Sequence, residues 1–516
     1  MTNLDLLLVN PSTRKVYQKY QESSFYPAFE PPYLAALTAE FIRNNGYEVR
    51  ILDANVDGLN PEETAQRVRD LSPKLVQIVV HGNQPSASTQ LMDEVYLESR
   101  AIKEILPETR ILLTGTHPSA LPSETLGEES AVDFVGRGEG FNTTIDILSG
   151  AAPAETRGLW FRKEEDIQSG PIDSLLTTQE IRGTLVKAAW DLLPVEKYRA
   201  HDWHCLDNLD ARQPYASIYT SFGCPFKCSF CCINAPFSEG GTRKNTIRFR
   251  DPEEVVSEIE MLVNDYGIRN LKIIDEMFVF NQKHYMAIAN GLIERGLGDK
   301  LNIWAYARID TVKEGNLDAL KKAGFNWLAL GIESGSAHVR EGSKKKIDED
   351  YMKNVVKIIQ NAGICIVDNY IFGLPDDNEE SMQRTLALAS DLKGDRPNFY
   401  CAMAYPGSQL HKLARQRRLP VPDGWNPQRA LLPEEKGGPG WIGYSQHSFE
   451  TWPLPTRYLF PEQVLAFRDN ALKAYFQDKS YKTRLKNKFG QPEKIDRFCE
   501  INSKTPKRMI LQHLKN

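Results

Sequence analysis

The sequence predicts an α/β protein with a doubly wound Rossmann-like sheet, a partial (β/α)6 TIM-like barrel and a smaller, mostly helical and irregular C-terminal segment. Short apolar runs alternate with amphipathic segments through the first 415 residues, and polar residues follow nearly every run. After Arg415 the composition changes to glycine- and proline-rich loops. We therefore expect a sheet domain, a connector, a barrel and a C-terminal lid or cap at residues 1–149, 150–213, 214–415 and 416–516.

The N-terminal sheet is predicted from five apolar runs, which suit parallel strands buried on both faces. Between these runs lie amphipathic segments that we expect to be helices. The expected strands are 4–9, 49–53, 75–80, 111–115 and 132–136, and the expected helices are 32–45, 61–71 and 89–106.

The carboxyl ends of these strands are the expected ligand-binding edge of such a sheet. No Gly-x-Gly-x-x-Gly opens a helix after the first strand, which disfavours a nicotinamide or flavin dinucleotide. Glycine, serine and threonine at several strand ends suit a large flat or extended ligand held by backbone and hydroxyl groups. The candidate binding residues are Asn10, Pro11, Ser12, His81, Gly82, Ser86, Ser88, Thr89, Thr114, Gly115, Thr116, His117, Gly138 and Glu139.

Three cysteines with the spacing Cys-x3-Cys-x2-Cys, namely Cys224, Cys228 and Cys231, follow a predicted strand at 217–220. Soft thiolates suit iron–sulfur clusters, and three of them can hold three irons of a cubane and leave the fourth open. Zinc is disfavoured because no second cysteine or histidine pair completes a four-ligand site. Cys232 diverges from its neighbour and is predicted to be a small buried residue.

A barrel is predicted after the cysteine loop, where strands and helices alternate again from the helix at 251–266 onward. With the cysteine strand these runs make six β/α units, and the active groups of such barrels gather at the carboxyl ends of the strands. The further strands are expected at 271–274, 301–306, 327–330, 364–372 and 399–403.

The cysteine loop, with Phe230 just before Cys231, closely resembles the signature of the radical S-adenosylmethionine (SAM) superfamily. The resemblance covers about residues 1–410. It implies a [4Fe–4S] cluster whose open iron chelates the amino and carboxylate groups of SAM. It further implies that the reduced cluster cleaves SAM to methionine and a 5′-deoxyadenosyl radical.

The resemblance also implies a SAM-binding role for several residues at the strand ends. Asp275 and Glu276 stand where the family binds the amino group, although the usual Gly-Gly-Glu is missing, and Arg308 stands where it binds the carboxylate. Glu333 and Ser334 stand where the family contacts the ribose and methionine of SAM, and Phe372 and Gly373 stand where it approaches adenine. The implied SAM-binding residues are Phe230, Asp275, Glu276, Arg308, Glu333, Ser334, Phe372 and Gly373.

The segments Thr-Gly-Thr-His-Pro-Ser-Ala-Leu-Pro and Gly-Arg-Gly-Glu-Gly resemble the cobalamin-binding domain that precedes the barrel in one large radical SAM class. The Asp-x-His-x-x-Gly motif, whose histidine ligates cobalt in other cobalamin proteins, is absent. The resemblance then implies that the nucleotide tail lies in the sheet and that no histidine from this motif reaches cobalt. The alternatives are a structural domain without a ligand, and His81 and His117 that only hydrogen bond their own loops.

The resemblance predicts a cobalamin-dependent radical SAM methyltransferase that methylates an unactivated carbon of a small metabolite, such as a sugar or a natural-product intermediate. One SAM would methylate cobalamin and a second would provide the radical. The first alternative is a cobalamin-dependent ring contraction, cyclisation or rearrangement without methylation. The second is a non-catalytic cobalamin or SAM sensor. Methylthiolation of RNA or protein is disfavoured because residues 1–204 contain no cysteine.

Composition fits a protein of the reducing cytoplasm. The net charge of −5 with 25% charged residues gives no electrostatic reason to expect nucleic acid or an anionic membrane. No apolar run approaches the length of a membrane span, and the N-terminus has no basic segment of a signal peptide. Clustered cysteines fit a reducing compartment. We expect a small-molecule substrate and an external electron donor of the flavodoxin or ferredoxin type, with no nucleic-acid or membrane partner.

Two remaining segments carry weaker expectations. The group His201-Asp202-Trp203-His204-Cys205 makes a weak metal site and is expected to pack between domains near the substrate entrance. The C-terminal segment, with Trp441, Phe449, Trp452 and a helix at 462–476, is predicted to be a lid or wall. Its single cysteine, Cys499, excludes an auxiliary cluster there.

Overall fold

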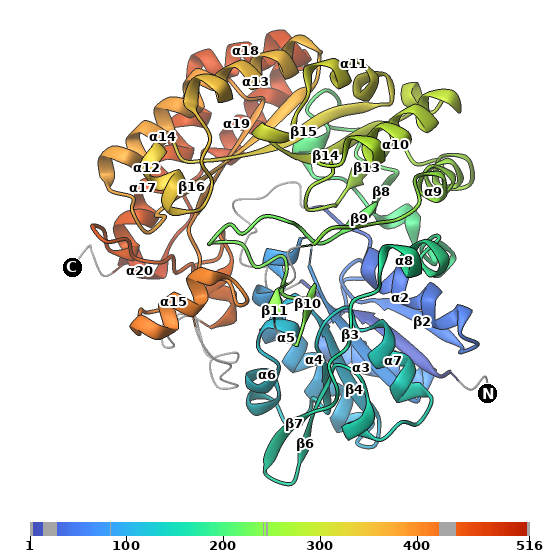
Figure 1. The fold of residues 1–516 in the computed structure, drawn as a ribbon. Coiled ribbons are helices and arrows are strands. Elements are labelled where there is room, and N and C mark those ends of the chain that lie inside the picture. The colour runs from blue at the N-terminus through green and yellow to red at the C-terminus, as the bar shows by residue number, and fades with distance from the viewer. Residues whose placement is uncertain are drawn as a thin grey trace.

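The computed structural model describes residues 4–13, 28–82, 84–240, 242–243, 246–422 and 440–512. Figure 1 shows an N-terminal sheet with its helices (blue to cyan), an open arc of strands and helices above it (green to orange) and C-terminal helices packed beside that arc. The carboxyl ends of both sets of strands face the region between them. Among the described residues no helix is both long and apolar enough to cross a membrane.

The N-terminal sheet contains five parallel strands, as predicted, and is extended at one edge by two antiparallel strands in the order β2-β1-β3-β4-β5-β6-β7. The added strands lie in the segment that the sequence predicted as a connector. They escaped prediction because β6 alternates buried with more exposed residues and β7 is mostly exposed, so neither strand is a continuous apolar run. The strands are β1 Leu6–Asn10, β2 Val49–Asp53, β3 Leu75–Val80, β4 Arg110–Gly115, β5 Phe134–Gly136, β6 Leu159–Lys163 and β7 Asp166–Ser169.

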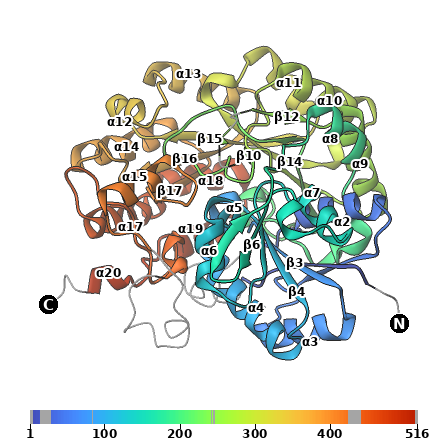
Figure 2. The ribbon, with the colours of Figure 1, turned by 60° about the horizontal axis from the view of Figure 1, so that its bottom comes forward.

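Helices cover both faces of this sheet, as Figure 2 shows. Successive side chains of a strand point to opposite faces. Leu6 and Leu8 of β1 therefore join the core with α2 (Tyr33–Asn44) and α7 (Phe141–Leu148), whereas Leu7 and Val9 join the core with α3 (Pro61–Leu71) and α4 (Met92–Ile105). The doubly wound arrangement is confirmed.

The second sheet is an open barrel of six parallel strands in the order β17-β16-β15-β14-β13-β8. The six strands thus lie side by side in the same order as they follow one another along the chain. This confirms the partial (β/α)6 barrel. Its strands are β8 Tyr215–Ile218, β13 Asn270–Ile273, β14 Asn302–Arg308, β15 Phe325–Glu333, β16 Cys365–Phe372 and β17 Arg396–Cys401. The main outer helices are α9 Pro252–Asp265, α10 Gln282–Glu294, α11 Glu314–Lys322, α13 Glu349–Asn361, α14 Glu379–Leu392 and α15 Gln409–Arg417.

A buried polar network joins the two sheets. Arg250 and Glu258 form an ion pair of 2.8 Å with both side chains fully buried. Tyr33 of α2 donates to Glu258 at 3.1 Å, and the Trp190 indole of the connector donates to it at 2.8 Å. Removing one member of a buried ion pair leaves an uncompensated charge that costs about 3–5 kcal/mol. The network therefore holds sheet and barrel in one orientation.

The C-terminal segment packs against the barrel. Its helices are α17 Pro461–Gln477, α18 Lys479–Phe489, α19 Pro492–Asn502 and α20 Met509–Gln512. Phe476, Leu485 and Phe498 belong to the same apolar core as the barrel strands. The helix predicted at 462–476 is confirmed. The Gly437-Gly438-Pro439 part of the predicted lid lies outside the described residues.

Candidate active site

Three adjoining cavities lie where the carboxyl ends of the two sheets face each other. The cluster cavity is lined by the cysteine loop and the ends of β14 and β15. The sheet cavity lies between the ends of β1 and β3 on one side and those of β8 and β13 on the other. The lumen cavity follows β14 and β17 into the inside of the barrel. All three share Gln84, Ser86 and Tyr306, so they form one continuous region.

The cysteine loop is shaped by its backbone contacts. Gly223 has φ +86°, and a Cβ there would lie 2.5 Å from the carbonyl oxygen of Thr246, so only glycine fits. Asn234 then clamps the loop by accepting from the amide of Cys224 at 3.1 Å and donating to its carbonyl at 2.9 Å. These contacts aim the first cysteine of the predicted triad into the cluster cavity.

Cys224, Cys228 and Cys231 all line the cluster cavity, which fits the expected iron–sulfur site. Among the described residues no three metal-binding side chains converge on a point that could hold one metal ion. A cubane distributes its three thiolates over three different irons, so such convergence is not required. Cys232 is 3% exposed, as predicted for a small packing residue.

Arg308 lies beside this loop, but its geometry differs from the expectation. Its Nε and Nη2 donate to the two carboxylate oxygens of Asp310, both at 2.9 Å, so the planar fork is already engaged. Its Nη1 lies 3.9 Å from the sulfur of Cys228, and the guanidinium stacks on Phe226 at 3.8 Å. A bidentate bond to a ligand carboxylate would have to use the remaining N–H groups of Nη1 and Nη2, unless Asp310 is displaced.

Three other residues predicted to bind SAM line the same cavity, namely Phe230, Glu276 and Glu333. Glu333 pairs with Lys345 at 2.7 Å, and Phe230 contributes to the wall. Glu276 is partly buried, and its buried Oε1 has no hydrogen-bond partner in the described structure. Burial, followed by the negative charge of Asp275, raises the pKa of Glu276 to about 8. A cationic group such as an amine would satisfy this carboxyl.

Four of the residues implied for SAM do not line any of these cavities. Asp275 is fully buried and accepts from Thr220 at 2.6 Å. Ser334 is also fully buried and lies within hydrogen-bonding distance of Thr385, at 3.1 Å. Phe372 stacks on Phe399 in the core, and Gly373 packs so closely that a Cβ would lie 2.4 Å from Val464. In this chain these four residues support the strand ends.

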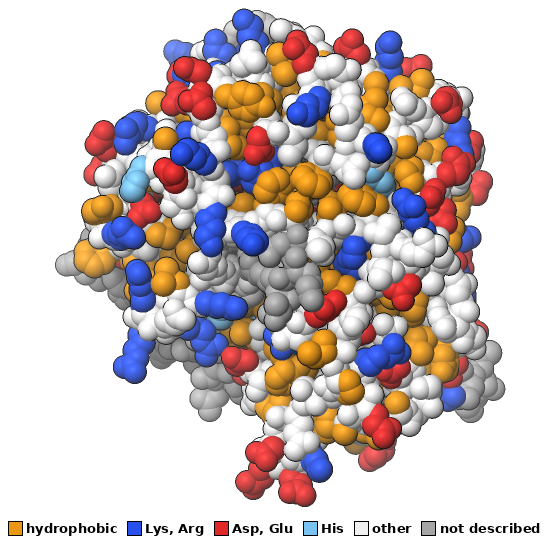
Figure 3. Space-filling view, in the orientation of Figure 1, with side chains coloured by type: hydrophobic (Ala, Val, Ile, Leu, Met, Phe, Trp, Pro, Cys, Tyr) orange, Lys and Arg blue, Asp and Glu red, His pale blue; other side chains and the backbone are white. Residues whose placement is uncertain are grey.

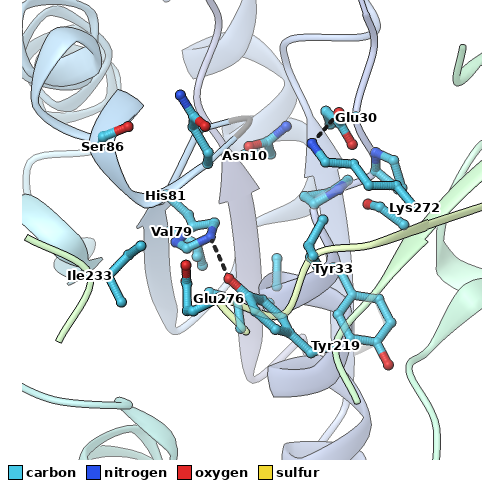
Figure 4. Close-up of a pocket in the computed structure, with 18 of the residues that line it drawn as sticks. Asn10, Glu30, Tyr33, Val79, His81, Ser86, Tyr219, Ile233, Lys272 and Glu276 are labelled. Atoms are coloured by element: carbon cyan, nitrogen blue, oxygen red, sulfur yellow. Dashed lines mark hydrogen bonds and ion pairs between the residues drawn. The ribbon is translucent and has the colours of Figure 1, made fainter. Parts of the chain in front are cut away.

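The sheet cavity gathers residues from both sheets, as Figure 4 shows: Asn10, His81 and Ser86 come from one side, and Tyr219 and Glu276 from the other. The Nε2 of His81 lies 3.2 Å from the hydroxyl of Tyr219. Burial lowers the pKa of His81 to about 4, so the imidazole is neutral. Gly82 also lines this cavity.

The other strand-end residues proposed for cobalamin line none of the three cavities, and most make contacts within the sheet domain. The His117 ring packs edge-on against Trp441 and lies near the Thr89 hydroxyl at 3.2 Å. Glu139 pairs with Arg248 at 2.9 Å. The full set outside these cavities is Pro11, Ser12, Ser88, Thr89, Thr114, Gly115, Thr116, His117, Gly138 and Glu139.

Several lining residues were not anticipated, notably Glu30, Lys272, Trp304 and Tyr400. Lys272 and Trp304 face the barrel lumen because they lie on one alternating face of their strands. That alternation is visible along β14, where Trp304, Tyr306 and Arg308 follow each other at every second position. The group at 201–205 lines the lumen cavity through its first four members, and the described residues hold no metal-binding group there.

The surface agrees with the balanced composition. On the face shown in Figure 3, basic and acidic side chains are interspersed over the described residues. A uniformly basic surface, which nucleic-acid binding would favour, is not a feature of that face.

Family models match both the barrel and the N-terminal sheet domain. A family model described as the radical SAM superfamily matches residues 218–389, and one described as the B12 binding domain matches residues 28–148. Fold and site thus define a radical SAM enzyme. With a B12 binding domain in front of its barrel, the chain belongs to the cobalamin-dependent radical SAM family, whose cofactors are a [4Fe–4S] cluster, SAM and cobalamin.

Individual relatives extend the comparison. An uncharacterized methyltransferase of Pyrococcus horikoshii is 27% identical over 440 residues, which cover 84% of this chain and 88% of the relative. An anaerobic magnesium-protoporphyrin IX monomethyl ester cyclase of Cereibacter sphaeroides is 26% identical, with 75% of this chain and 61% of the cyclase covered. The solved structure of the radical SAM methyltransferase TsrM from Kitasatospora setae has a TM-score of 0.67 and 17% identity. The structural match covers 97% of this chain and 99% of TsrM, and it supports the fold.

Proposed function

We propose that this enzyme is a methyltransferase that places a methyl group on an unactivated carbon of a small molecule. The observation that carries the proposal is the continuity of the cavities: the cysteine loop and the B12-domain strand ends open into one region between the sheets. A methyl donor bound at one edge and a radical source at the other would both reach a substrate there. The match over most of both chains to a methyltransferase supports this choice.

The residues of the chain have separable tasks in this proposal. Cys224, Cys228 and Cys231 would hold the cluster, and Glu276 and Arg308 would contact the amino acid part of SAM. When bound, the cluster and SAM supply the 5′-deoxyadenosyl radical and cobalamin supplies the methyl group. The chain itself orients these groups and excludes water from the cavity. The cluster would be reduced by an external donor of the flavodoxin or ferredoxin type.

The strand ends that would hold cobalamin are Asn10, His81, Gly82 and Ser86, which line the sheet cavity. The Asp-x-His-x-x-Gly motif is absent, and the Nε2 of His81 already lies 3.2 Å from the Tyr219 hydroxyl. We therefore propose that cobalt receives no histidine from this domain. The buried strand-end residues would act by supporting the loops that contact cobalamin.

The test uses anaerobically reconstituted enzyme with hydroxocobalamin, a chemical reductant and SAM labelled in its methyl group. The proposal expects S-adenosylhomocysteine and labelled methyl bound to cobalamin before any substrate is added. The similarity to a cyclase favours one alternative, a radical reaction without methylation. Formation of 5′-deoxyadenosine without any S-adenosylhomocysteine would support that alternative and contradict ours.

A further inference from the structure

The lumen cavity is a chamber inside the barrel, with a volume of about 240 Å³. Alternate residues of a strand share one face. Trp304 and Tyr306 of β14 therefore face it together, as do Arg396 and Tyr400 of β17. A chamber of this size suits a small metabolite.

Hydrogen-bond donors without partners gather in this chamber. In the described structure the Nε of Arg396, the Nε1 of Trp203 and the Nε1 of Trp304 are buried and make no hydrogen bond. Both ring nitrogens of His204 are also buried without a partner. Buried polar atoms in native proteins are almost always paired. Several unpaired donors lining one cavity point to a ligand that brings acceptor atoms.

The charges around the chamber favour an anion. Lys272 is paired with Glu30 at 3.0 Å (Figure 4). Arg396 is 8% exposed and donates to the amide oxygen of Asn502 at 2.9 Å and to the carbonyl of Pro397. Asp202 in the same wall interacts with Arg396 electrostatically but pairs with His201, and no described carboxylate lies within ion-pair distance of Arg396. A buried guanidinium normally has an anionic partner.

A second cationic group adds to this excess of positive charge. Arg468 lines the chamber and pairs with Asp469 at 2.7 Å. The same carboxylate also accepts from Arg508 at 2.8 Å, so one negative charge serves two guanidiniums. Burial first, and these arginines next, hold the pKa of His447 in the chamber wall well below its usual value.

The chamber walls are flat and aromatic. His204 lies nearly parallel to Trp203, with ring centroids 5.7 Å apart and an interplanar angle of 15°. Trp304 is 4.9 Å from His204 on another side. Such surfaces hold planar rings by stacking.

The chamber also lies in the right place for chemistry. Trp304, Tyr306, Tyr400 and Gln446 line both the lumen cavity and the cluster cavity. A ring held in the lumen can therefore present one edge toward the cysteine loop while an anionic group on its other end reaches Arg396.

We propose that the lumen cavity is the substrate site and that its substrate is a planar aromatic carboxylate, held by Arg396 and the indole donors of Trp203 and Trp304. This inference rests on the proposed function because it identifies the molecule to be methylated. The guanidinium also stacks on Phe476 at 4.9 Å and on Phe498 at 5.6 Å. A purely structural clamp made by these contacts would show no preference among ligands.

The test measures binding to reconstituted holoenzyme by anaerobic calorimetry with three probes that share one ring system: the isosteric pair naphthalene-2-carboxylate and naphthalene-2-carboxamide, and the cationic 2-naphthylmethylamine. The carboxylate should bind at least about tenfold more tightly than the amide, the range for a charge-assisted hydrogen bond. The amine should bind most weakly. Equal affinity for all three, no binding of any, or preference for the amine would overturn the inference.

Substitutions locate the effect. Arg396→Gln should reduce the carboxylate affinity to that of the amide and leave the amide within about twofold, whereas the exposed Arg269→Gln should change neither. Should Arg396→Gln fail to fold, Trp304→Phe removes an indole donor and keeps a ring, and should weaken the carboxylate several-fold. An unchanged carboxylate preference in the folded variants would assign Arg396 to structure alone. Preferential binding of the carboxylate by an enzyme that transfers no methyl group from SAM to cobalamin would contradict the proposed function and leave this inference standing. Methyl transfer to cobalamin without a preference for the carboxylate would support the proposed function and contradict this inference.

Discussion

Arg308 and Asp310 form a bidentate ion pair at the end of β14, with Nε–Oδ1 and Nη2–Oδ2 distances of 2.9 Å. The pair points the remaining nitrogen, Nη1, toward Cys228. A guanidinium oriented in this way can still contact a carboxylate through the free N–H groups of Nη1 and Nη2. Asp310 thus sets how Arg308 can meet a ligand at the cluster cavity.

Replacing Arg308 should weaken SAM binding. Arg308→Lys keeps the charge but loses the oriented guanidinium, so SAM binding should become weaker by about 1–3 kcal/mol. Asp310→Asn releases the fork, and its SAM affinity should equal or exceed that of the wild type. Anaerobic equilibrium binding at matched iron content measures both. Wild-type affinity in Arg308→Lys would show that this residue does not bind SAM.

The cysteine triad should account for all of the iron. Reconstituted wild-type enzyme should hold about four irons per chain, and a triple alanine variant at Cys224, Cys228 and Cys231 should lose them together with 5′-deoxyadenosine formation. Cys232→Ala is the matched control, since this neighbour is buried as packing, and it should keep both. Iron analysis measures the cluster content, and chromatography of the reaction products measures 5′-deoxyadenosine. Full iron retention in the triple variant would refute the cluster assignment.

Cobalamin should bind roughly one per chain without a histidine ligand from the sheet domain. His81 is held by Tyr219 and His117 is packed on Trp441. Substituting either residue by alanine should therefore leave the absorption and electron paramagnetic resonance spectra of bound cobalamin unchanged. A nitrogen-ligated cobalt signal that disappears in one of these variants would contradict the expectation. A lack of any cobalamin uptake would remove it altogether.

Glu276 should make the stability of the ligand-free enzyme fall with rising pH. Its pKa is raised from 4.5 to about 8 by burial and by Asp275. Between these values the unfolded chain has lost a proton that the folded chain keeps, so folding becomes less favourable as pH increases from about 5 to about 8.

The matching variant isolates this effect. Glu276→Gln cannot ionise, so it should gain about 1–4 kcal/mol relative to the wild type across this pH range. Urea unfolding without SAM at pH 5.5 and pH 8 measures the difference. The exposed Glu294→Gln serves as the control and should show a constant offset. An equal offset for Glu276→Gln at both pH values would mean that this carboxyl ionises normally.

Much of the fold could be predicted because its signals are local. Buried parallel strands such as Leu75–Val80 are continuous apolar runs, and the cysteine spacing lies within eight residues of one loop. The antiparallel hairpin β6–β7 was missed because one exposed face leaves no such run. The alternation along β14 shows which side chains share a face of the strand. Only the tertiary structure shows which of the two faces points into the barrel.

The sequence by itself determined the two α/β units, their order and the residue types offered at the strand ends. Only the tertiary structure decided which of these residues reach a cavity. Asp275 and Glu276 are adjacent, yet one is held by Thr220 while the other is left without a partner for its Oε1. Likewise Arg396, far from the cysteines in sequence, lines the same continuous region. The reason is physical: burial and pairing depend on neighbours brought by other strands, and these contacts exist only after the sheet domain and the barrel have packed with the carboxyl ends of their strands toward each other.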